Sequence, residues 1–523
     1  MSYRVLIPTA GTGSRLGKLT QYVNKSLVSI ANRPTISHVI EQFPQDTEFV
    51  VALGYKGHLV REFLELAYPG RQFFFANVNP FEGPESGLGL SVLECKKFLQ
   101  QPFVFISCDT LVREEIPLPD CNWMGYAELS SFEQYRTLEV IDGQIKAICE
   151  KGIGKKGSHK AYIGLAGISD YKTFWESMEN GGKQAIAAGE SHGLRAVLEK
   201  GIQSHCFTWY DTGTPEALIQ TRQAYQELDS PNILEKSNEA IWFVDGQVIK
   251  FSDDESFIAN RVARARELAG FVPEITGAML HMYRYPKIKG NVLSKVITLP
   301  LFEQLLEYSK SFWDSSVLSS SEEHDFRGNC MRFYRDKTMD RVQLFYKKFK
   351  KQDGVEIING CKMPTLQKLL DTIDWDWMAA GEAGRFHGDL HFENIIYSEA
   401  NRHFTFLDWR QEFGGSLTIG DIYYDFAKLL HGLIICHELI AKDHYQIEWK
   451  TDNIAFDFLR KQVLVECERD FDRWLTQNKY DNKKVRIMTA LIYLNIAALH
   501  HEPYCFLLYA LGKKMLKQEF EED

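Results

Sequence analysis

The chain has 523 residues, more than a single hydrophobic core usually serves, so we expect at least two domains. Hydrophobic residues make up 45% and charged residues 25% of the sequence, which excludes a disordered or fibrous protein. The formal net charge of -10 argues against a protein that binds nucleic acid by neutralising its phosphates. The composition therefore predicts a soluble globular protein.

The start of the chain and its cysteines indicate a compartment. The segment MSYRVLIPTAG lacks the basic start and apolar stretch of a secretory signal. No apolar run approaches the ~20 residues that a membrane-spanning helix needs. The ten cysteines are spaced singly, without the CxxC pairs of zinc or redox sites. These features predict a cytoplasmic protein with reduced thiols and no membrane span.

Residues 1–225 alternate short apolar runs with longer amphipathic stretches. Strands and helices that take turns predict an α/β domain with a mostly parallel, Rossmann-like sheet, because parallel strands need crossover connections. A polar break with Ser, Pro and Asn follows, and it places a domain boundary near Ser230. We therefore expect one domain over 1–229 and a second over 230–523.

The second half begins with AIWFVDGQVIKFSD, which predicts a β-hairpin with Asp245 and Gly246 in the turn. Long amphipathic patterns then dominate 298–376 and 420–518, and short strand-like runs lie between them. This half is expected to be an α+β domain rich in helices.

A glycine loop follows the first predicted strand. Ala10, Gly11 and Gly13 allow the backbone to approach a ligand, and their N–H groups can bind phosphate oxygens. Arg15 and Lys25 add positive charge, so the segment suits a nucleoside triphosphate. A glycine turn beside a solvated arginine is also a common structural solution, so the motif is weak by itself.

Two aspartates follow predicted strands in this half. Asp109 ends the run FVFISCD, and Asp211 lies in TWYDTGTPEAL just before a predicted helix. Ligands of open α/β sheets bind at the carboxyl ends of strands, where the two carboxylates could hold one Mg²⁺. Each aspartate taken alone could equally be a helix N-cap.

The glycine loop with Lys25, the strand-end Asp109, the ICEK segment and WYDTGTPEAL together resemble the sugar-phosphate and choline-phosphate nucleotidyltransferases. The resemblance covers about 225 residues. It implies that Arg15 and Lys25 hold the triphosphate, that Asp109 and Asp211 bind Mg²⁺, and that pyrophosphate is released. Gly87, in ESGLGLS, would line the base pocket without distinguishing CTP from UTP or dTTP.

The sequence departs from that family at two places. Asn24 stands where the family often has proline before the lysine, and Cys108 replaces the usual glycine before the aspartate. All of the charged groups are present, so these departures do not remove the expected chemistry.

The segment FHGDLHFENIIY carries a second group of candidate catalytic residues. Asp389 and Asn394 have the D-x-x-x-x-N spacing with which protein kinases place a base beside the substrate hydroxyl and an amide on magnesium. Asp408 follows, in FTFLDWR, where the kinase pattern needs its main metal-binding carboxylate. A core histidine, a turn aspartate and a capping asparagine would explain the same residues only by coincidence.

Two upstream residues extend this pattern. Lys250 ends the hairpin, where kinases place the lysine that binds the nucleotide phosphates, and Glu267 is the candidate partner that fixes it. Glu255 competes with Glu267 for that role, since a glutamate on a helix surface is usually solvated.

HGDLHFEN, LDWR and GDIYYDFAKLL resemble the aminoglycoside phosphotransferase and choline kinase superfamily over about 290 residues. The resemblance implies a two-lobed protein-kinase-like fold and ATP-dependent phosphorylation of a small hydroxyl compound. Asp389 would be the base, Asn394 and Asp408 the Mg²⁺ ligands, and Asp425 a support of the catalytic loop. Arg410 stands where choline kinases commonly have glutamate, which weakens a choline assignment.

Together, the two halves predict a bifunctional enzyme. ATP would phosphorylate a hydroxyl compound, and the phosphate ester would react with a second nucleoside triphosphate, CTP or UTP, to give an activated sugar, polyol or choline-like group for surface polysaccharide synthesis. The alternative is a kinase with a non-catalytic, ligand-sensing or assembly domain at its N-terminus. The sequence leaves open whether the chain forms a homo-oligomer.

Overall fold

The computed structural model describes all residues except 1, 130–132, 155–158, 227–235 and 522–523. The chain divides into two compact units. The first contains Met1–Ile258 and Ile275–Lys287, and the second contains Ala259–Glu274 and Ile288–Asp523. Ser230, the expected boundary, lies outside the described residues. The division into 1–229 and 230–523 thus remains a prediction, while the compact units part further along the chain.

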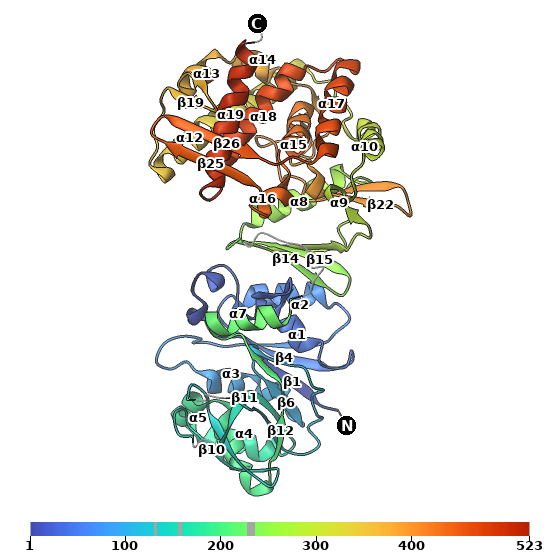
Figure 1. Cartoon of the computed structure of the whole chain (residues 1–523). Helices are drawn as coiled ribbons and strands as arrows, with labels where there is room; N and C mark the ends of the chain where they lie inside the picture. Colours follow the sequence, from blue (N-terminus) through green and yellow to red (C-terminus); the bar gives the residue numbers. More distant parts are fainter. Residues whose placement is uncertain (1, 130–132, 155–158, 227–235, 522–523) are drawn as a thin grey trace. The chain divides into compact units, whose positions relative to one another are not determined.

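The first unit is built on a nine-stranded sheet, several of whose strands are labelled in Figure 1. Its order is β5-β4-β1-β6-β11-β8-β12-β10-β9. The first four strands are parallel, and helices connect them, as the alternation in the sequence predicts. These strands are β1 (Arg4–Pro8), β4 (Glu48–Leu53), β5 (Phe73–Asn77) and β6 (Phe103–Ile106).

The other half of the sheet corrects the expectation of a mostly parallel arrangement. Strand β11 pairs antiparallel with β6, β8 and β9, and β10 pairs antiparallel with β9 and β12. Asp142 and Gly143, both with positive φ, form a tight hairpin turn between β9 and β10. The strands are β8 (Trp123–Ala127), β9 (Thr137–Ile141), β10 (Gln144–Cys149), β11 (His159–Ile168) and β12 (Gln203–Cys206).

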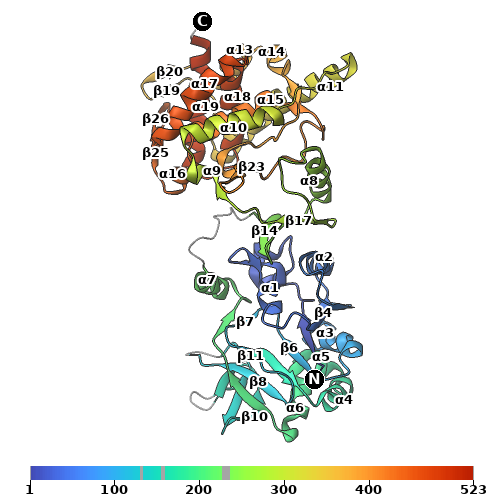
Figure 2. The same ribbon diagram turned by 90° about the vertical axis from the view of Figure 1, so that its right-hand side faces the viewer.

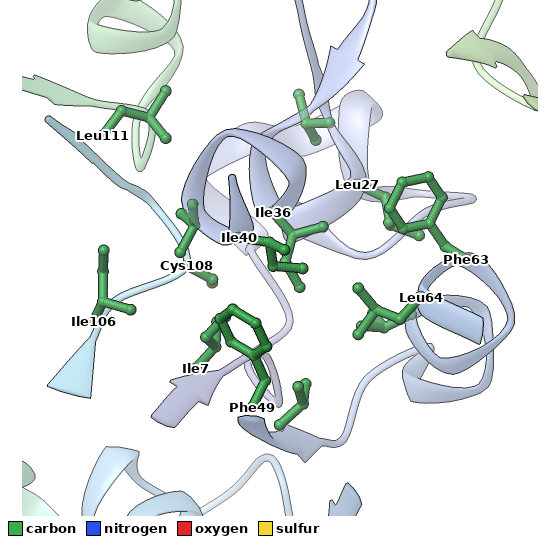
Figure 3. Packing of buried hydrophobic residues seen from close by; sticks show 14 of the residues in the cluster. Ile7, Leu27, Ile36, Ile40, Phe49, Phe63, Leu64, Ile106, Cys108 and Leu111 are labelled. Carbon is green, nitrogen blue, oxygen red and sulfur yellow. The ribbon is translucent and has the colours of Figure 1, made fainter. Parts of the chain in front are cut away.

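Side chains that alternate along the parallel strands supply two cores, one on each face of the sheet. Val5 and Ile7 of β1 belong to one cluster, whereas Leu6 belongs to the other. Figure 3 shows the first cluster, in which the sheet packs against α1 (Thr35–Ile40) and α2 (Gly57–Ala67). The opposite face packs against α3 (Leu88–Cys95), α4 (Tyr171–Asn180), α5 (Gly182–Ala188) and α6 (Glu190–Ala196). Helices therefore cover both faces of the sheet, and this packing fixes the positions of the strand ends.

A second, four-stranded sheet completes the first unit, in the order β14-β15-β17-β16. The predicted hairpin is confirmed: β14 (Glu239–Val244) and β15 (Gln247–Ser252) flank Asp245 and Gly246, which have positive φ. Trp242 is fully buried, lies 5.3 Å from the ring of Phe63, and donates a 2.9 Å hydrogen bond to Ser29 Oγ. The hairpin therefore shares the core of the first unit. The remaining two strands are β16 (Gly277–Ala278) and β17 (Met282–Pro286).

The second unit is mainly helical, as expected. Helices α15, α17, α18 and α19 lie side by side, α10 packs on α17 and α12 packs on α18 (Figures 1 and 2). Every residue of α15 is buried, which makes it the central helix. The bounds are α10 (Leu299–Phe312), α11 (Ser320–Met331), α12 (Lys337–Phe349), α15 (Ile422–Ile434), α17 (Gln462–Gln477), α18 (Asn482–Ala497) and α19 (Tyr504–Glu521).

Short strands flank the loop that carries Asp389. The strand β21 (Ala383–Gly384) precedes the loop, and the hairpin of β22 (Ile395–Ser398) and β23 (His403–Phe406) follows it. A further sheet has the order β20-β19-β26-β25. Its strands are β19 (Glu356–Ile358), β20 (Cys361–Met363), β25 (Tyr445–Lys450) and β26 (Asn453–Phe458). Within the described residues, the structure contains no helix with the length and apolar character needed to cross a membrane.

Candidate active sites

The first candidate site begins at the end of β1, where the glycine loop leads into the 3₁₀ turn η1 (Ser14–Thr20). Gly13 has φ of 65°, the left-handed region that favours glycine. A Cβ on Gly13 would lie 2.9 Å from Lys25 Cβ and 3.0 Å from Thr20 Cγ2. Gly13 is therefore needed for the close approach of the loop to Lys25.

Asn24, one of the two departures from the family pattern, anchors the segment that carries Lys25. It is fully buried, and its Nδ2 donates to the carbonyls of Thr9, at 2.9 Å, and Tyr55, at 2.6 Å. Its Oδ1 accepts from Ser26 N at 2.9 Å. Since these bonds tie the lysine segment to the end of β1, Asn24 supplies by hydrogen bonds the rigidity that a proline would supply by its ring.

Lys25 and Asp109 form an ion pair of 3.0 Å between Nζ and Oδ2. Burial opposes both charges, but the Lys25 ammonium and the Ser107 hydroxyl lower the pKa of Asp109 to about 2. The same carboxylate raises the pKa of Lys25 above its ordinary value, although burial acts against it. Both groups are therefore charged at neutral pH.

Asp211 lies beside Asp109 because β13 (Trp209–Asp211) pairs with β7 (Thr110–Val112). Asp211 Oδ1 accepts from Gly213 N at 2.8 Å, and Oδ2 accepts from the Tyr135 hydroxyl at 3.1 Å. Burial, and then the charge of Asp109, raise the pKa of Asp211. The electrostatic repulsion between two carboxylates so close together would be offset by a bound cation.

Gly213 shows how close the two carboxylates are. A Cβ on this residue would lie 3.1 Å from Asp211 Oδ1 and 3.4 Å from Asp109 Oδ2. Both oxygens thus border one small space, and carboxylate oxygens are the ligands that Mg²⁺ prefers. The residues present fit the expected magnesium ion.

These residues line a cleft of about 390 Å³ in the first unit. The predicted residues that line it are Ala10, Gly11, Arg15, Lys25, Gly87, Asp109 and Asp211, whereas Gly13 is not part of its wall. Gly87 and Gly89 also have a packing role, because a Cβ on either would lie within 2.5 Å of a carbonyl oxygen of α5. The sequence predicted only the base-pocket role of Gly87.

Other cleft residues were missed by sequence reasoning. Tyr135 and Trp209 meet edge to face with centroids 4.9 Å apart, and Arg136 and the buried Glu190 line the same cleft. Apart from the position of Trp209 two residues before Asp211, they follow no motif. Glu150 of the ICEK segment pairs with Arg136 at 3.2 Å and with Arg195 at 2.5 Å, and the adjacent Lys151 lines the cleft.

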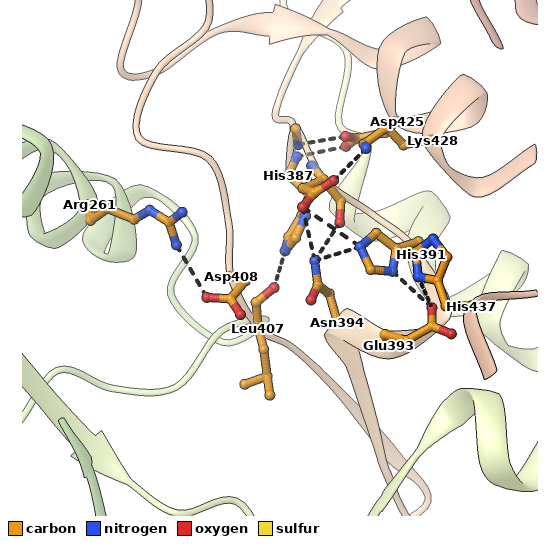
Figure 4. Close-up of polar contacts among 12 residues, drawn as sticks. Arg261, His387, His391, Glu393, Asn394, Leu407, Asp408, Asp425, Lys428 and His437 are labelled. Atoms are coloured by element: carbon orange, nitrogen blue, oxygen red, sulfur yellow. Dashed lines mark hydrogen bonds and ion pairs between the residues drawn. The ribbon is translucent and has the colours of Figure 1, made fainter. Parts of the chain in front are cut away.

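The second candidate site lies in the second unit, around the loop that carries Asp389 (Figure 4). Asp425 accepts 2.7 Å hydrogen bonds from the backbone N–H groups of His387 and Gly388, and a 3.2 Å bond from Trp313 Nε1. Burial raises the pKa of Asp425 to about 6. These contacts suit the loop-supporting role that the resemblance implies for Asp425.

Asp389 is held between two partners. Lys428 Nζ lies 2.7 Å from Asp389 Oδ1, and Asn394 Nδ2 donates to the Asp389 carbonyl at 2.9 Å. Burial opposes ionisation, but Lys428 and then His391 lower the pKa of Asp389 well below its usual range. The carboxylate is therefore ionised, as a base must be, and the bond of Nδ2 leaves Asn394 Oδ1 as the atom that can bind a metal ion.

Asp408 is tied to the same loop through its neighbour in the chain. Leu407 N donates to the Asn394 carbonyl at 2.7 Å, and the Leu407 carbonyl lies 2.8 Å from His387 Nε2. Asp408 has φ of 59° and its Oδ1 lies 3.4 Å from Arg261, as Figure 4 shows. Asp408 and Asn394 offer carboxylate and amide oxygens, the donor set that suits Mg²⁺.

His391, Glu393 and His437 form a cluster that the motif did not predict. His391 Nδ1 lies 3.0 Å and His437 Nδ1 lies 3.6 Å from Glu393 Oε2. Burial opposes the charge of His391, but Asp389 and Glu393 raise its pKa to about 9. His391 thus carries a positive charge next to the catalytic loop.

The two upstream residues lie in different units. Lys250 is buried in β15 of the first unit. Glu267 is the exposed last residue of α8 (Glu255–Glu267), in the part of that helix that belongs to the second unit. Their pairing stays a prediction.

Comparison with known proteins follows the same division of the chain. Residues 330–444 match the family model described as "Phosphotransferase enzyme family" (APH), so this part of the chain is similar to that family. The N-terminal region resembles nucleotidyltransferases. The low-salt glycan biosynthesis nucleotidyltransferase Agl11 of Haloferax volcanii is 26% identical over 238 residues, 42% of this chain and 65% of that protein. The bifunctional protein GlmU of Methanocaldococcus jannaschii is 23% identical over 257 residues, 47% of this chain and 59% of that protein.

Solved structures give weaker likenesses. A putative glucose-1-phosphate thymidylyltransferase from Bacillus anthracis is 16% identical with a TM-score of 0.38, over 45% of this chain and 98% of that one. The CTP:phosphocholine cytidylyltransferase of Streptococcus pneumoniae is 14% identical with a TM-score of 0.36, over 43% of this chain and 100% of that one.

Proposed function

We propose that this chain is a bifunctional enzyme that first phosphorylates a small hydroxyl compound with ATP and then couples the phosphate ester to a nucleoside triphosphate. The observation that carries the proposal is the pair Asp109 and Asp211, whose oxygens border one space beside the Lys25 ammonium. Together with the ionised Asp389 of the phosphotransferase domain, this pair gives the chain two separate sets of reactive groups.

The proposed reaction in the first unit takes place in the cleft. Arg15 and Lys25 neutralise the triphosphate, with the backbone of Ala10 and Gly11 beside it. A phosphate oxygen of the ester attacks the α-phosphorus, the bond to the β-phosphate oxygen breaks, and pyrophosphate leaves. Magnesium held by Asp109 and Asp211 would supply charge neutralisation of the phosphates. CTP or UTP is the proposed nucleotide.

The proposed phosphoryl transfer uses Asp389 of the second unit as the base. The substrate hydroxyl gives its proton to Asp389 while its oxygen attacks the γ-phosphorus of ATP, and ADP leaves. Magnesium held by Asn394 and Asp408 would neutralise the ATP phosphates. Lys250 is the proposed phosphate-binding lysine. Asp425 acts by positioning the loop through its bonds to the backbone at 387 and 388.

The order of the two reactions follows from their chemistry, because the first yields the phosphate ester that the second consumes. The product would be a nucleotide-activated sugar, polyol or choline-like group. The name of Agl11 links one relative of the N-terminal region to glycan synthesis, which supports surface polysaccharide synthesis as the destination.

The test is a pair of assays on the purified chain with a panel of hydroxyl compounds and their phosphate esters. We expect ADP formation from ATP with a hydroxyl compound, and pyrophosphate release from CTP or UTP with the matching ester. Asp389→Ala should abolish only the first reaction and Asp109→Asn only the second. ADP formation without pyrophosphate release from any triphosphate would favour the alternative, a kinase with a non-catalytic N-terminal domain.

A further inference from the structure

The two carboxylate oxygens of Asp389 face different surroundings. Oδ2 lies 3.3 Å from Asn394 Nδ2, on the side of the proposed metal ligands. Oδ1 lies 2.7 Å from Lys428 Nζ, which comes from the central helix α15. Figure 4 shows Lys428 and Asn394 on different sides of the loop. The proposed metal ion and the ATP phosphates would lie on the Oδ2 side, which leaves the Oδ1 side to the phosphoryl acceptor.

Three more basic residues gather near Lys428. The ring of Phe333 has Lys337 Nζ at 4.1 Å and Arg410 Cζ at 4.7 Å from its centroid. Arg341 follows Lys337 by one turn on the same face of α12. We call Lys337, Arg341, Arg410 and Lys428 the basic cluster.

Aromatic packing and the catalytic loop fix the basic cluster in place. Tyr424, one turn before Lys428 in α15, packs edge to face on Phe333 with centroids 4.9 Å apart. The stem of Arg410 crosses the loop so closely that a Cβ on Gly388 would lie 2.6 Å from Arg410 Cβ. Gly388 is the residue directly before Asp389, so the Arg410 side chain begins close to the proposed base.

The basic cluster has little acidic counter-charge. Among the described residues, Lys337, Arg341 and Arg410 form no ion pair with a carboxylate, and the buried Arg410 Nε has no hydrogen-bond partner. Burial lowers the pKa of Lys337 to about 7, and Arg410, Lys428 and Arg341 act in the same direction against Asp389. Four basic side chains around one carboxylate leave an excess of positive charge, even with Lys337 only partly protonated at neutral pH, and an anionic ligand would neutralise it.

We propose that the basic cluster binds an anionic group of the phosphoryl acceptor, so that the kinase substrate is a small alcohol that carries a carboxylate or a phosphate. This inference rests on the proposed kinase function and narrows its substrate class. Choline and aminoglycosides are cations and would be repelled. Residues on α12, α15 and the segment after Asp408 would determine which charge the acceptor must carry, whereas Asp389 would accept the proton of its hydroxyl.

The experiment measures ATP-dependent phosphorylation by the full chain with matched acceptors. The panel pairs neutral polyols and sugars with their acid and phosphate forms, such as glycerol with glycerate and glycerol 3-phosphate, and includes choline as a cation. We expect kcat/KM for anionic acceptors to exceed that of neutral counterparts by about 10- to 100-fold, the worth of a hydrogen bond to a charged group. Equal or better use of neutral or cationic acceptors would overturn the inference and leave the proposed kinase function in place.

Variants separate an acceptor site from a site for ATP phosphates. Lys337→Gln and Arg410→Gln should raise KM for the anionic acceptor about tenfold or more and change KM for ATP less than about twofold. Lys347→Gln, an exposed lysine of the same helix outside the basic cluster, is the control and should change neither. A rise in KM for ATP instead would show that the basic cluster binds the γ-phosphate.

A binding measurement distinguishes failure of the kinase proposal from failure of the anion-site proposal. Glycerol 3-phosphate and glycerate, added without ATP, should raise the melting temperature of the wild-type chain more than glycerol does, and Lys337→Gln should remove the difference. Anion-dependent stabilisation without phosphorylation of any acceptor would support the anion site and count against the kinase function. Absence of both effects would overturn both.

Discussion

A single methyl group placed at Gly213 should strongly slow nucleotidyl transfer by filling the space between the two carboxylates of the first unit. The added Cβ would lie 3.1 Å from Asp211 Oδ1 and 3.4 Å from Asp109 Oδ2. Mg²⁺ binds oxygen at about 2.0–2.1 Å, so an ion that contacts both oxygens would occupy the region that the methyl group takes. The backbone of Gly213 has no positive φ, and alanine can adopt it without strain.

The size of the effect follows from what the metal contributes. Charge stabilisation by a bound metal is worth several kcal/mol, and each ~1.4 kcal/mol corresponds to a tenfold change in rate. Loss of one of the two carboxylate ligands should therefore lower kcat/KM for pyrophosphate release at least ~100-fold in Gly213→Ala. The Mg²⁺ concentration for half-maximal rate should rise as well, because the ligands must move apart to readmit the ion.

The assay is a Mg²⁺ titration of pyrophosphate release with CTP or UTP and the phosphate ester, alongside the ADP assay of the kinase. Gly70→Ala is the matched control, since its Cβ would meet nothing within 4 Å and lies away from the cleft. Kinase activity and melting temperature should be unchanged in both variants. Near-normal pyrophosphate release by a folded Gly213→Ala variant would refute a shared metal site of Asp109 and Asp211.

Three further results are expected. Asp389→Ala should abolish ADP formation but leave pyrophosphate release from a supplied ester within about twofold, because the reacting groups lie in separate units; loss of both activities in a folded variant would contradict two sites. Trp242→Ala should lower the free energy of unfolding of the first unit by ~3–5 kcal/mol in a urea titration, the cost of emptying a buried aromatic site, and unchanged stability would show that the hairpin is not part of that core. The KM of an anionic acceptor should rise about 5- to 10-fold between pH 6 and pH 8. Lys337 lies beside the rest of the basic cluster and Asp389 and has a pKa of about 7, so it loses its proton over that range. A flat pH profile of KM, or the same slope in Lys337→Gln, would contradict this.

The candidate catalytic groups could be predicted from the sequence because their signals are local. Asp389 and Asn394 are five residues apart on one loop, and the structure joins them by a direct hydrogen bond. The glycine loop and Lys25 are close in the chain in the same way, with η1 and a short bend between them. Asp109 and Asp211 are distant in sequence, but each ends a strand, and strand ends meet at one edge of a sheet.

Other features depend on contacts between distant segments. The direction of the strands after β6 could not be predicted from alternation, because hairpin loops and crossover helices both separate apolar runs. The hairpin at Trp242 has the sequence of a kinase strand pair, yet its indole fits the core of the first unit. A boundary predicted from a polar segment carries no information on which core takes the strands that follow it.

The sequence by itself determined which residues can do chemistry, since short motifs record the local geometry of loops, turns and strand ends. Only the tertiary structure decided what surrounds those residues. It brings Lys428 from α15 to Asp389, Tyr135 to Asp211, and Arg410 and Lys337 to one aromatic ring. Charge, burial and ligand preference at a site are sums over neighbours from many segments, and the folded chain alone brings those neighbours together.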